Sequence, residues 1–202
     1  MPILKSEVAL FPPDLFALPA RMTPWRVAYV RSRQEKALAR HLLRHAVAFY
    51  LPLEEKLVQR AGRRFVSQLP LFPGYVFFRG AVAERLTALA SDRVASVLDV
   101  LDQTQLDAEL RALWRLQESG AALVSHPYLG PGDLVRVVEG PFQGLSGTVL
   151  REKGRTRLVV SVTFLRRSVA GEFERQALAP ARPGRDPARE IEGSASWRHR
   201  AG

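Results

Sequence analysis

The spacing of apolar residues along the chain alternates between two periods, which predicts a domain of mixed strands and helices. Apolar residues at every second position are typical of a half-buried strand, and recurrence at every third or fourth position is typical of an amphipathic helix. In chain order these patterns predict a strand over 25–30, a helix over 33–48, a hairpin with strands 57–60 and 65–69, a strand over 75–78, a helix over 81–90, a strand near 94–100 and a helix over 105–119. This order favours an α+β fold, with helices packed on an antiparallel sheet.

A second region, residues 131–181, shows only the strand period. Val135 and Val137 alternate with polar residues, and a second β-branched run covers residues 158–164. Between them, Gly140-Pro141 and Gly144 supply turn residues. Short strands separated by Gly-rich turns predict a small β-barrel.

The strand over 75–78 is apolar on both of its faces. Tyr75 and Phe77 share one face, and Val76 and Phe78 share the other. Two interpretations stay open: the sheet is buried on both sides within its domain, or one face lies under the helices and the other is a hydrophobic docking patch.

Composition shifts divide the chain into five segments. The divisions are a disordered leader over 1–22, a first domain over 23–119, a linker over 120–130, a second domain over 131–181 and a disordered tail over 182–202. Prolines interrupt the leader, and the tail holds Pro, Gly, Arg and Glu without apolar periodicity.

The charge balance favours a polyanionic partner. The chain of 202 residues carries a formal net charge of +10 and has no cysteine, which excludes disulfides and fits a reducing compartment. The N-terminus is a poor signal peptide, and no apolar run is long enough to span a bilayer. We therefore expect a soluble cytoplasmic monomer without a membrane partner.

The predicted helix over 33–48 carries a basic ridge. Arg33, Lys36, Arg40 and Arg44 follow one another at helical spacing, beside His41 and His45. The ridge is either an ordinary solvated helix face or a nucleic-acid contact in which the histidines bond to bases or stack on them.

Catalytic signals are weak throughout the sequence. His41 and His45 have the i, i+4 spacing of metal ligands but no third ligand beside them, and there is no P-loop, GxGxxG or Gly-x-Ser-x-Gly motif. We expect no catalytic residue, no cofactor and no metal, and hence a protein that is not an enzyme.

Two motifs in the same chain resemble the NusG family of transcription elongation factors. Residues 25–30 (WRVAYV) and 71–77 (LFPGYVF) resemble its N-terminal NGN domain, and residues 132–149 resemble its KOW motif. The resemblance implies an NGN domain joined by a linker to a small SH3-like KOW barrel. It also implies a bacterial factor that docks on the RNA polymerase clamp, contacts non-template DNA and suppresses pausing.

The resemblance also implies functional residues. For the polymerase clamp these are Val27, Tyr29, Phe72, Tyr75 and Phe77; for DNA they are Arg31, Lys36, Arg40, His41, Arg44 and His45; for a small-subunit ribosomal protein, bound by the KOW domain, they are Phe164, Leu165 and Arg167. Rho is a further partner of the family, and Arg166 stands where the family has a glycine.

Within the family, residues 41–47 and the entry 70–73 resemble the specialised RfaH-like antitermination paralogs. Three functions therefore stay in view: an RfaH-like antiterminator, a general elongation factor of the NusG type, and a KOW-containing ribosomal RNA-binding protein. For the KOW domain we predict strands rather than the helical hairpin into which RfaH can refold, because residues 159–163 are rich in β-branched side chains.

Overall fold

The computed structural model describes residues 7–17, 23–60, 63–118, 123–127, 134–137, 146–152, 155–173 and 178–180. Its elements are β1 (Leu10–Phe11), β2 (Trp25–Val30), α1 (Glu35–Arg44), β3 (Phe49–Tyr50), β4 (Leu53–Arg60), β5 (Arg63–Pro70), β6 (Tyr75–Arg79), α2 (Val82–Leu89), β7 (Val94–Asp99), α3 (Gln103–Glu118), β8 (Leu123–Pro127), β9 (Leu134–Val137), β10 (Ser146–Glu152), β11 (Arg155–Val162), η1 (Thr163–Leu165), β12 (Arg167–Phe173) and β13 (Leu178–Pro180).

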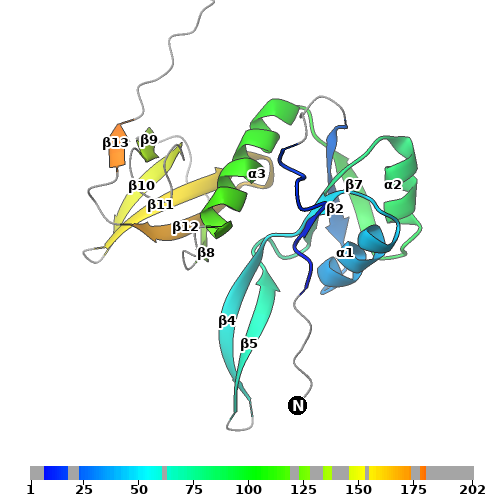
Figure 1. Cartoon of the computed structure of the whole chain (residues 1–202), viewed down its shortest axis with the longest axis horizontal. Helices are drawn as coiled ribbons and strands as arrows, with labels where there is room; N and C mark the ends of the chain where they lie inside the picture. The colour runs from blue at the N-terminus through cyan, green and yellow to red at the C-terminus, as the bar shows by residue number, and fades with distance from the viewer. Residues whose placement is uncertain are drawn as a thin grey trace, which may run out of the picture.

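The first unit is a three-layer α+β structure. Its antiparallel sheet has the strand order β1-β3-β6-β2-β7. Figure 1 shows β2 and β7 of this sheet beside α1 and α2. Buried leucine and alanine side chains from α1 and α2 cover one face, and leucines of α3 cover the other. The predicted antiparallel sheet with packed helices is confirmed. None of the described helices combines the length and the apolar composition needed to cross a bilayer.

Part of the predicted disordered leader belongs to this unit. Leu10 and Phe11 pair with Tyr50 and Phe49 as an edge strand. Leu15 and Phe16 are buried in the core, and the Phe16 ring lies 5.3 Å from that of Tyr50. The leader prediction is therefore wrong for residues 7–17, because its apolar side chains fill the sheet face beside α3 and outweigh the prolines between them.

Helix α1 ends four residues before the predicted limit. Ala46 adopts a φ of +54°, the N–H of Val47 bonds to the carbonyl of Leu42 at 3.0 Å, and the N–H of Ala46 bonds to that of Leu43 at 3.1 Å. This is a Schellman ending, in which the left-handed position is usually a glycine. The sequence concealed the ending because alanine occupies that position.

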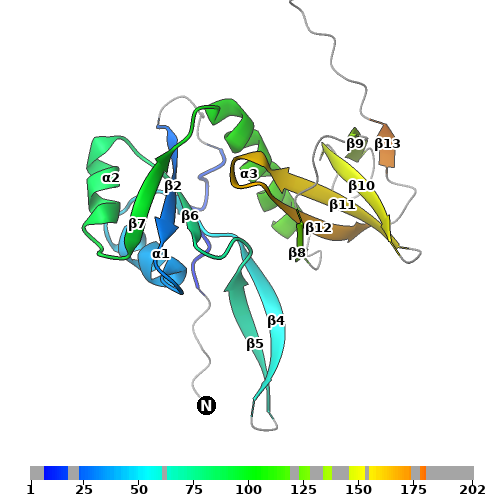
Figure 2. The ribbon, with the colours of Figure 1, turned by 180° about the vertical axis from the view of Figure 1, so that it is seen from behind.

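The hairpin of β4 and β5 is confirmed and is longer than predicted. The two strands form a separate two-stranded sheet that projects from the first unit (Figure 2). The residues at its turn, 61–62, lie outside the described residues.

The second unit is an antiparallel sheet with the order β13-β9-β10-β11-β12-β8. Strand β8 lies within the predicted linker and pairs with β12, so that segment is not a plain connection. Closure of the sheet into a barrel and the limits of the two domains stay predictions. The glycine turns at 138–145 and the tail at 182–202 lie outside the described residues.

Helix α3 lies between the two units (Figure 1). Val162, at the end of β11, is fully buried in the same apolar cluster as Leu106, Leu110 and Leu113 of α3. Phe164 and Leu165 of η1 pack against that cluster. The two units therefore share one core at this point.

Candidate functional site

The five predicted clamp-contact residues gather at one place on the sheet. Strands β2 and β6 are neighbours, with Val27 opposite Phe77 and Tyr29 opposite Tyr75. Alternation predicted which residues share a face within each strand, and the register places both pairs on the same face. Phe72 precedes β6 and its ring meets that of Phe77 edge-on at 5.9 Å.

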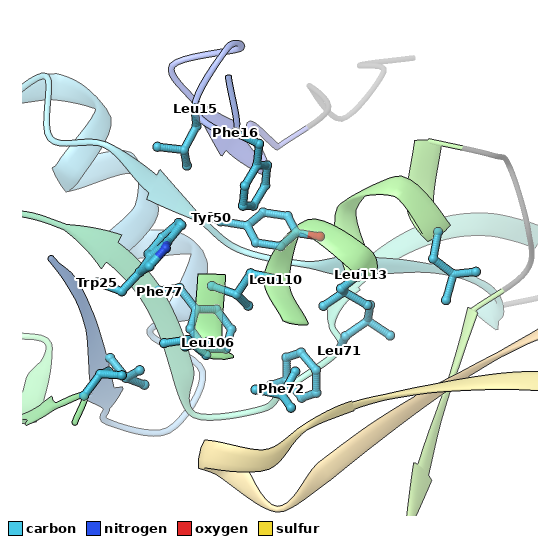
Figure 3. Packing of buried hydrophobic residues seen from close by; sticks show 14 residues of the cluster. Leu15, Phe16, Trp25, Tyr50, Leu71, Phe72, Phe77, Leu106, Leu110 and Leu113 are labelled. Atoms are coloured by element: carbon cyan, nitrogen blue, oxygen red, sulfur yellow. The ribbon is translucent and has the colours of Figure 1, made fainter. Parts of the chain in front are cut away.

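Only the tyrosine end of this group reaches solvent. Val27 and Phe77 are fully buried and Phe72 is 2% exposed, so these three belong to the core. Figure 3 shows Phe72 and Phe77 among the packed side chains of that core. Tyr29 is 46% exposed and Tyr75 is half-buried, and their rings lie 5.3 Å apart at an angle of 44°. We call these two residues the tyrosine pair.

A turn at residues 71–74 holds the tyrosine pair in place. Gly74 has a φ of +90°, and a Cβ atom there would lie 3.3 Å from the Tyr29 ring. The N–H of Gly74 donates to the buried carboxylate of Glu35 at 2.7 Å, and its carbonyl accepts from Val30 at 2.8 Å. Sequence patterns carried no sign of this role, because Glu35 is a single acidic residue among the basic residues of the helix.

The predicted DNA-contact residues differ in their exposure to solvent and in their ion pairs. Arg31, Arg40, Arg44 and His45 are exposed, whereas Lys36 and His41 are half-buried. Arg31 lies 3.8 Å from the carboxylate of Asp92, and Arg40 is 3.2 Å from that of Glu7. Exposed pairs of this kind contribute little energy, so both guanidinium groups can exchange partners.

The rings of His41, in α1, and His45, just after it, lie against each other at an angle of 35°, with ring centres 4.3 Å apart. Nε2 of His41 donates to the carbonyl of Thr87 at 3.0 Å, and Nδ1 of His45 donates to the carbonyl of His41 at 2.9 Å. Burial lowers the pKa of His41, against the opposing effect of its bond to Thr87. His41 therefore supports α2, and His45 is the histidine turned to solvent.

The predicted ribosomal-protein residues lie in the turn between β11 and β12. Phe164 and Leu165 are half-buried against the core of the first unit, and Arg167 is exposed. Arg166, in the glycine position of the family, has a φ of +50°. The turn thus adopts the left-handed conformation without a glycine, which costs about 1 kcal/mol.

A hydrogen bond joins this turn to α3. The N–H of Thr163 donates to the Glu109 carboxylate at 3.0 Å. Both residues line a cavity of about 250 Å³, together with residues 99–102, 105, 106 and 164. Burial raises the pKa of Glu109, although the Thr163 bond opposes the shift. Sequence patterns alone gave no signal for this contact between the units.

The described residues hold no group of three or more metal-ligating side chains. His41 and His45 are each bonded to a backbone carbonyl. The site is therefore suited to binding a partner: it has an exposed aromatic pair on one side and exposed cations on α1 on the other.

Comparison with known proteins identifies the family. The family model described as "Transcription termination factor nusG" matches residues 23–111. The transcription termination/antitermination protein NusG of Vibrio vulnificus is 30% identical over 161 residues, covering 70% of this chain and 85% of that protein. The protein of the same name from Pasteurella multocida is 36% identical over 135 residues, covering 61% and 72% of the two chains.

A solved structure titled "Domain interaction in Thermotoga maritima NusG" is 16% identical, with a TM-score of 0.44, covering 81% of this chain and all of that one. The family assignment rests on the sequence relatives. The chain belongs to the NusG family of transcription termination and antitermination factors.

Proposed function

We propose that this protein docks on the clamp of RNA polymerase through the tyrosine pair and acts there during transcript elongation. The observation that carries the proposal is that Tyr29 and Tyr75 reach solvent on a sheet face whose other aromatic side chains, Trp25, Tyr50 and Phe77, are buried. Exposed aromatic rings held rigidly above a packed core are typical anchors of protein interfaces. The names of the relatives, termination/antitermination proteins, support a role in transcription.

The basic surface of α1 is our candidate for contact with non-template DNA. Its exposed members are Arg31, Arg40, Arg44 and His45, and an unpaired strand offers phosphates to the arginines and base faces to the histidine. Lys36 and His41 complete the predicted surface; both are half-buried, and His41 is bonded to the carbonyl of Thr87 in α2.

The turn at Phe164, Leu165 and Arg167 is our candidate for binding a small-subunit ribosomal protein, and Rho stays a further predicted partner of the barrel. Phe164 and Leu165 pack against the first unit in this structure. A protein that binds both side chains therefore has to compete with α3 for them.

Two forms of the function are distinguished by where the protein acts. Residues 41–47 favour an RfaH-like factor confined to particular operons, whereas the relatives above are named NusG and favour a general factor. Genome-wide crosslinking separates them: occupancy of a few long operons supports the RfaH-like form, and occupancy of most transcribed genes contradicts it.

The docking proposal is tested with Tyr29→Ala combined with Tyr75→Ala. We expect the affinity for RNA polymerase to fall at least about thirtyfold, since an aromatic hot spot contributes about 2 kcal/mol or more. Binding is measured by surface plasmon resonance on immobilised polymerase, and the thermal unfolding midpoint is measured in parallel.

A matched control removes an exposed apolar pair elsewhere. Val82 and Leu86 of α2 are 66% and 57% exposed, so Val82→Ala with Leu86→Ala should leave polymerase affinity unchanged. Equal losses in the two variants, or full affinity in the tyrosine variant, would show that the polymerase contact lies elsewhere.

A further inference from the structure

A single residue, Gly74, fixes the connection between β2 and α1. The N–H of Gly74 donates to the Glu35 carboxylate at 2.7 Å, and the carbonyl of Gly74 accepts from the N–H of Val30 at 2.8 Å. Val30 is the last residue of β2, and Glu35 is the first residue of α1. Gly74 therefore holds both ends of the segment 30–35, and we call this arrangement the Gly74 joint.

The Gly74 joint lies between the two candidate surfaces. Tyr29 directly precedes Val30, and Tyr75 directly follows Gly74, so the tyrosine pair flanks the joint on one side. On the other side, the exposed Arg31 lies within the held segment, and α1 begins where that segment ends. The hydrogen bonds of one residue thus connect the aromatic pair to the basic surface of α1.

The backbone of the held segment is itself constrained. The N–H of Arg31 donates to the carbonyl of Arg93 at 2.9 Å, and the N–H of Gln34 donates to the carbonyl of Arg31 at 3.1 Å. Arg33, between them, has a φ of +59°. The spacing of the two surfaces is therefore set by a bonded turn and by the Gly74 joint.

Glu35 is the side chain that closes the joint. It is 7% exposed, and a buried carboxylate needs donors or positive charge close to it. The Gly74 N–H is such a donor, and the N-terminal end of α1 favours an acid in its first turn. If the carboxylate is moved away, the Gly74 N–H loses its acceptor, and α1 is no longer tied to the turn that carries Tyr75.

We propose that Glu35 is a positioning residue, which holds the tyrosine pair and the basic surface of α1 at a fixed spacing so that both engage one target at once. The inference rests on the proposed function. Two surfaces on one rigid body bind a target that presents both partners more tightly than either partner alone, and this gain is lost when the geometry does not allow both contacts. Because Glu35 is buried, it acts through Gly74 and touches neither partner.

The test measures the affinity of the full-length protein for RNA polymerase on a nucleic-acid scaffold with an unpaired non-template strand, and for the same complex without that strand. The ratio of the two affinities is the gain from simultaneous binding, and we expect about tenfold or more in the unchanged protein. Glu35→Asp keeps the charge but shortens the side chain by one methylene, which takes the carboxylate out of reach of Gly74. We expect the ratio to fall to about threefold or less in this variant, with little change in affinity for the complex that lacks the strand.

Two outcomes for Glu35→Asp would overturn the proposal. A ratio that stays at its original value would show that the bond to Gly74 does not set the spacing. An equal loss of affinity with and without the strand would show that Glu35 supports the tyrosine pair alone.

Two control variants isolate the hydrogen bond. Glu35→Gln removes the charge but keeps an oxygen acceptor for Gly74, so its ratio should match that of the unchanged protein; a loss there would assign the effect to charge. Glu84, in the first turn of α2, accepts from the N–H of Ala81 at the same distance of 2.7 Å. Glu84→Asp should leave the ratio unchanged, and a loss equal to that of Glu35→Asp would overturn the assignment to Glu35.

The same assay distinguishes failure of this inference from failure of the proposed function. If Tyr29→Ala combined with Tyr75→Ala leaves polymerase binding unchanged, the docking proposal fails. If the tyrosine variant loses binding but the unchanged protein gains nothing from the unpaired strand, the DNA contact fails and the positioning role fails with it. If both surfaces bind and Glu35→Asp keeps the full ratio, the positioning role alone is overturned.

Discussion

The two faces of the N-terminal sheet are both buried, but they are covered in different ways. The face with Ala28, Val76 and Phe78 is covered by α1 and α2, which lie close to those strands in the chain. The face with Val27 and Phe77 is covered by the N-terminal segment with Leu15 and Phe16, by α3, and by the turn between β11 and β12. One face is closed by neighbours in sequence, and the other is closed by three segments far apart.

The second face also contains charged groups. Asp107 of α3 accepts from the Trp25 indole at 2.8 Å and from Nε of Arg111 at 2.6 Å, and it pairs with Arg79 of β6. The guanidinium of Arg79 lies 4.5 Å from the centre of the Trp25 ring. A face assembled from distant segments is thus fixed by directional bonds as well as by apolar packing, and its open end is where the tyrosine pair lies.

The largest loss of stability is expected from substitutions that disrupt the apolar packing of either face. Phe77 and Phe78 are neighbours on opposite faces, and both are fully buried. Phe77→Ala and Phe78→Ala should each lower the free energy of unfolding by about 3 to 5 kcal/mol. Urea denaturation compares them. A loss of less than about 1 kcal/mol for Phe77→Ala alone would show that its face is not a packed core.

The next effect removes the charge at the centre of the second face. Asp107→Asn removes the negative charge that faces Arg79, whose side chain is 1% exposed, and should cost about 3 kcal/mol. The control is Asp99→Asn: this carboxylate pairs with Arg26 while 74% exposed, so less than about 1 kcal/mol is expected. Similar losses in the two variants would contradict a special role for the buried group.

The same variant has a pH signature. Burial acts to raise the pKa of Asp107, but hydrogen bonds from Arg111 and Trp25 and the nearby positive charges outweigh it, so the pKa lies below its usual 3.8. A depressed carboxyl pKa stabilises the fold above the ordinary value, and that stability is lost as pH falls through the folded-state value. Unfolding free energies measured from pH 5 downward should fall less steeply in Asp107→Asn than in the unchanged protein.

The smallest effect concerns the contact between the units. Because burial raises the pKa of Glu109 above its usual 4.5, its contribution to stability is greatest below that value and is lost as pH rises through the raised pKa, although the Thr163 bond itself favours the ionised carboxylate. Glu109→Gln keeps an acceptor for Thr163 and cannot ionise. We expect less than about 1 kcal/mol of change at pH 7 and a flatter stability profile between pH 4 and 7, measured by urea denaturation. An unaltered profile would place the titration elsewhere.

Much of the first unit could be predicted because its signals are local. Alternation located β2 and β6, and the spacing of leucines located α3. The end of α1 could not be predicted, because Ala46 takes a conformation that sequence patterns assign to glycine. The order at Leu15 and Phe16 was missed for another reason: it depends on α3, about ninety residues away in the chain.

The candidate site was predicted in composition but not in exposure. Periodicity grouped Val27 with Tyr29 and Tyr75 with Phe77, and left open whether this face is core or docking patch. The structure divides each pair, with Val27 and Phe77 in the core and both tyrosines at its rim. That division depends on the positions of α3 and of the turn between β11 and β12, and the sequences of β2 and β6 carry no information about those positions.

The second face is covered by segments far apart in the chain, and this has a consequence for synthesis on the ribosome. The face under α1 and α2 needs no residue beyond Val97, but the other is finished only by Phe164 and Leu165. At about 5 to 20 residues per second, the ribosome needs roughly 3 to 14 s to make the intervening chain. During that interval the nascent protein presents Phe72 and its neighbours without their C-terminal cover. Limited proteolysis of stalled nascent chains should find this region sensitive until residue 165 has left the exit tunnel, and early protection would refute the delay.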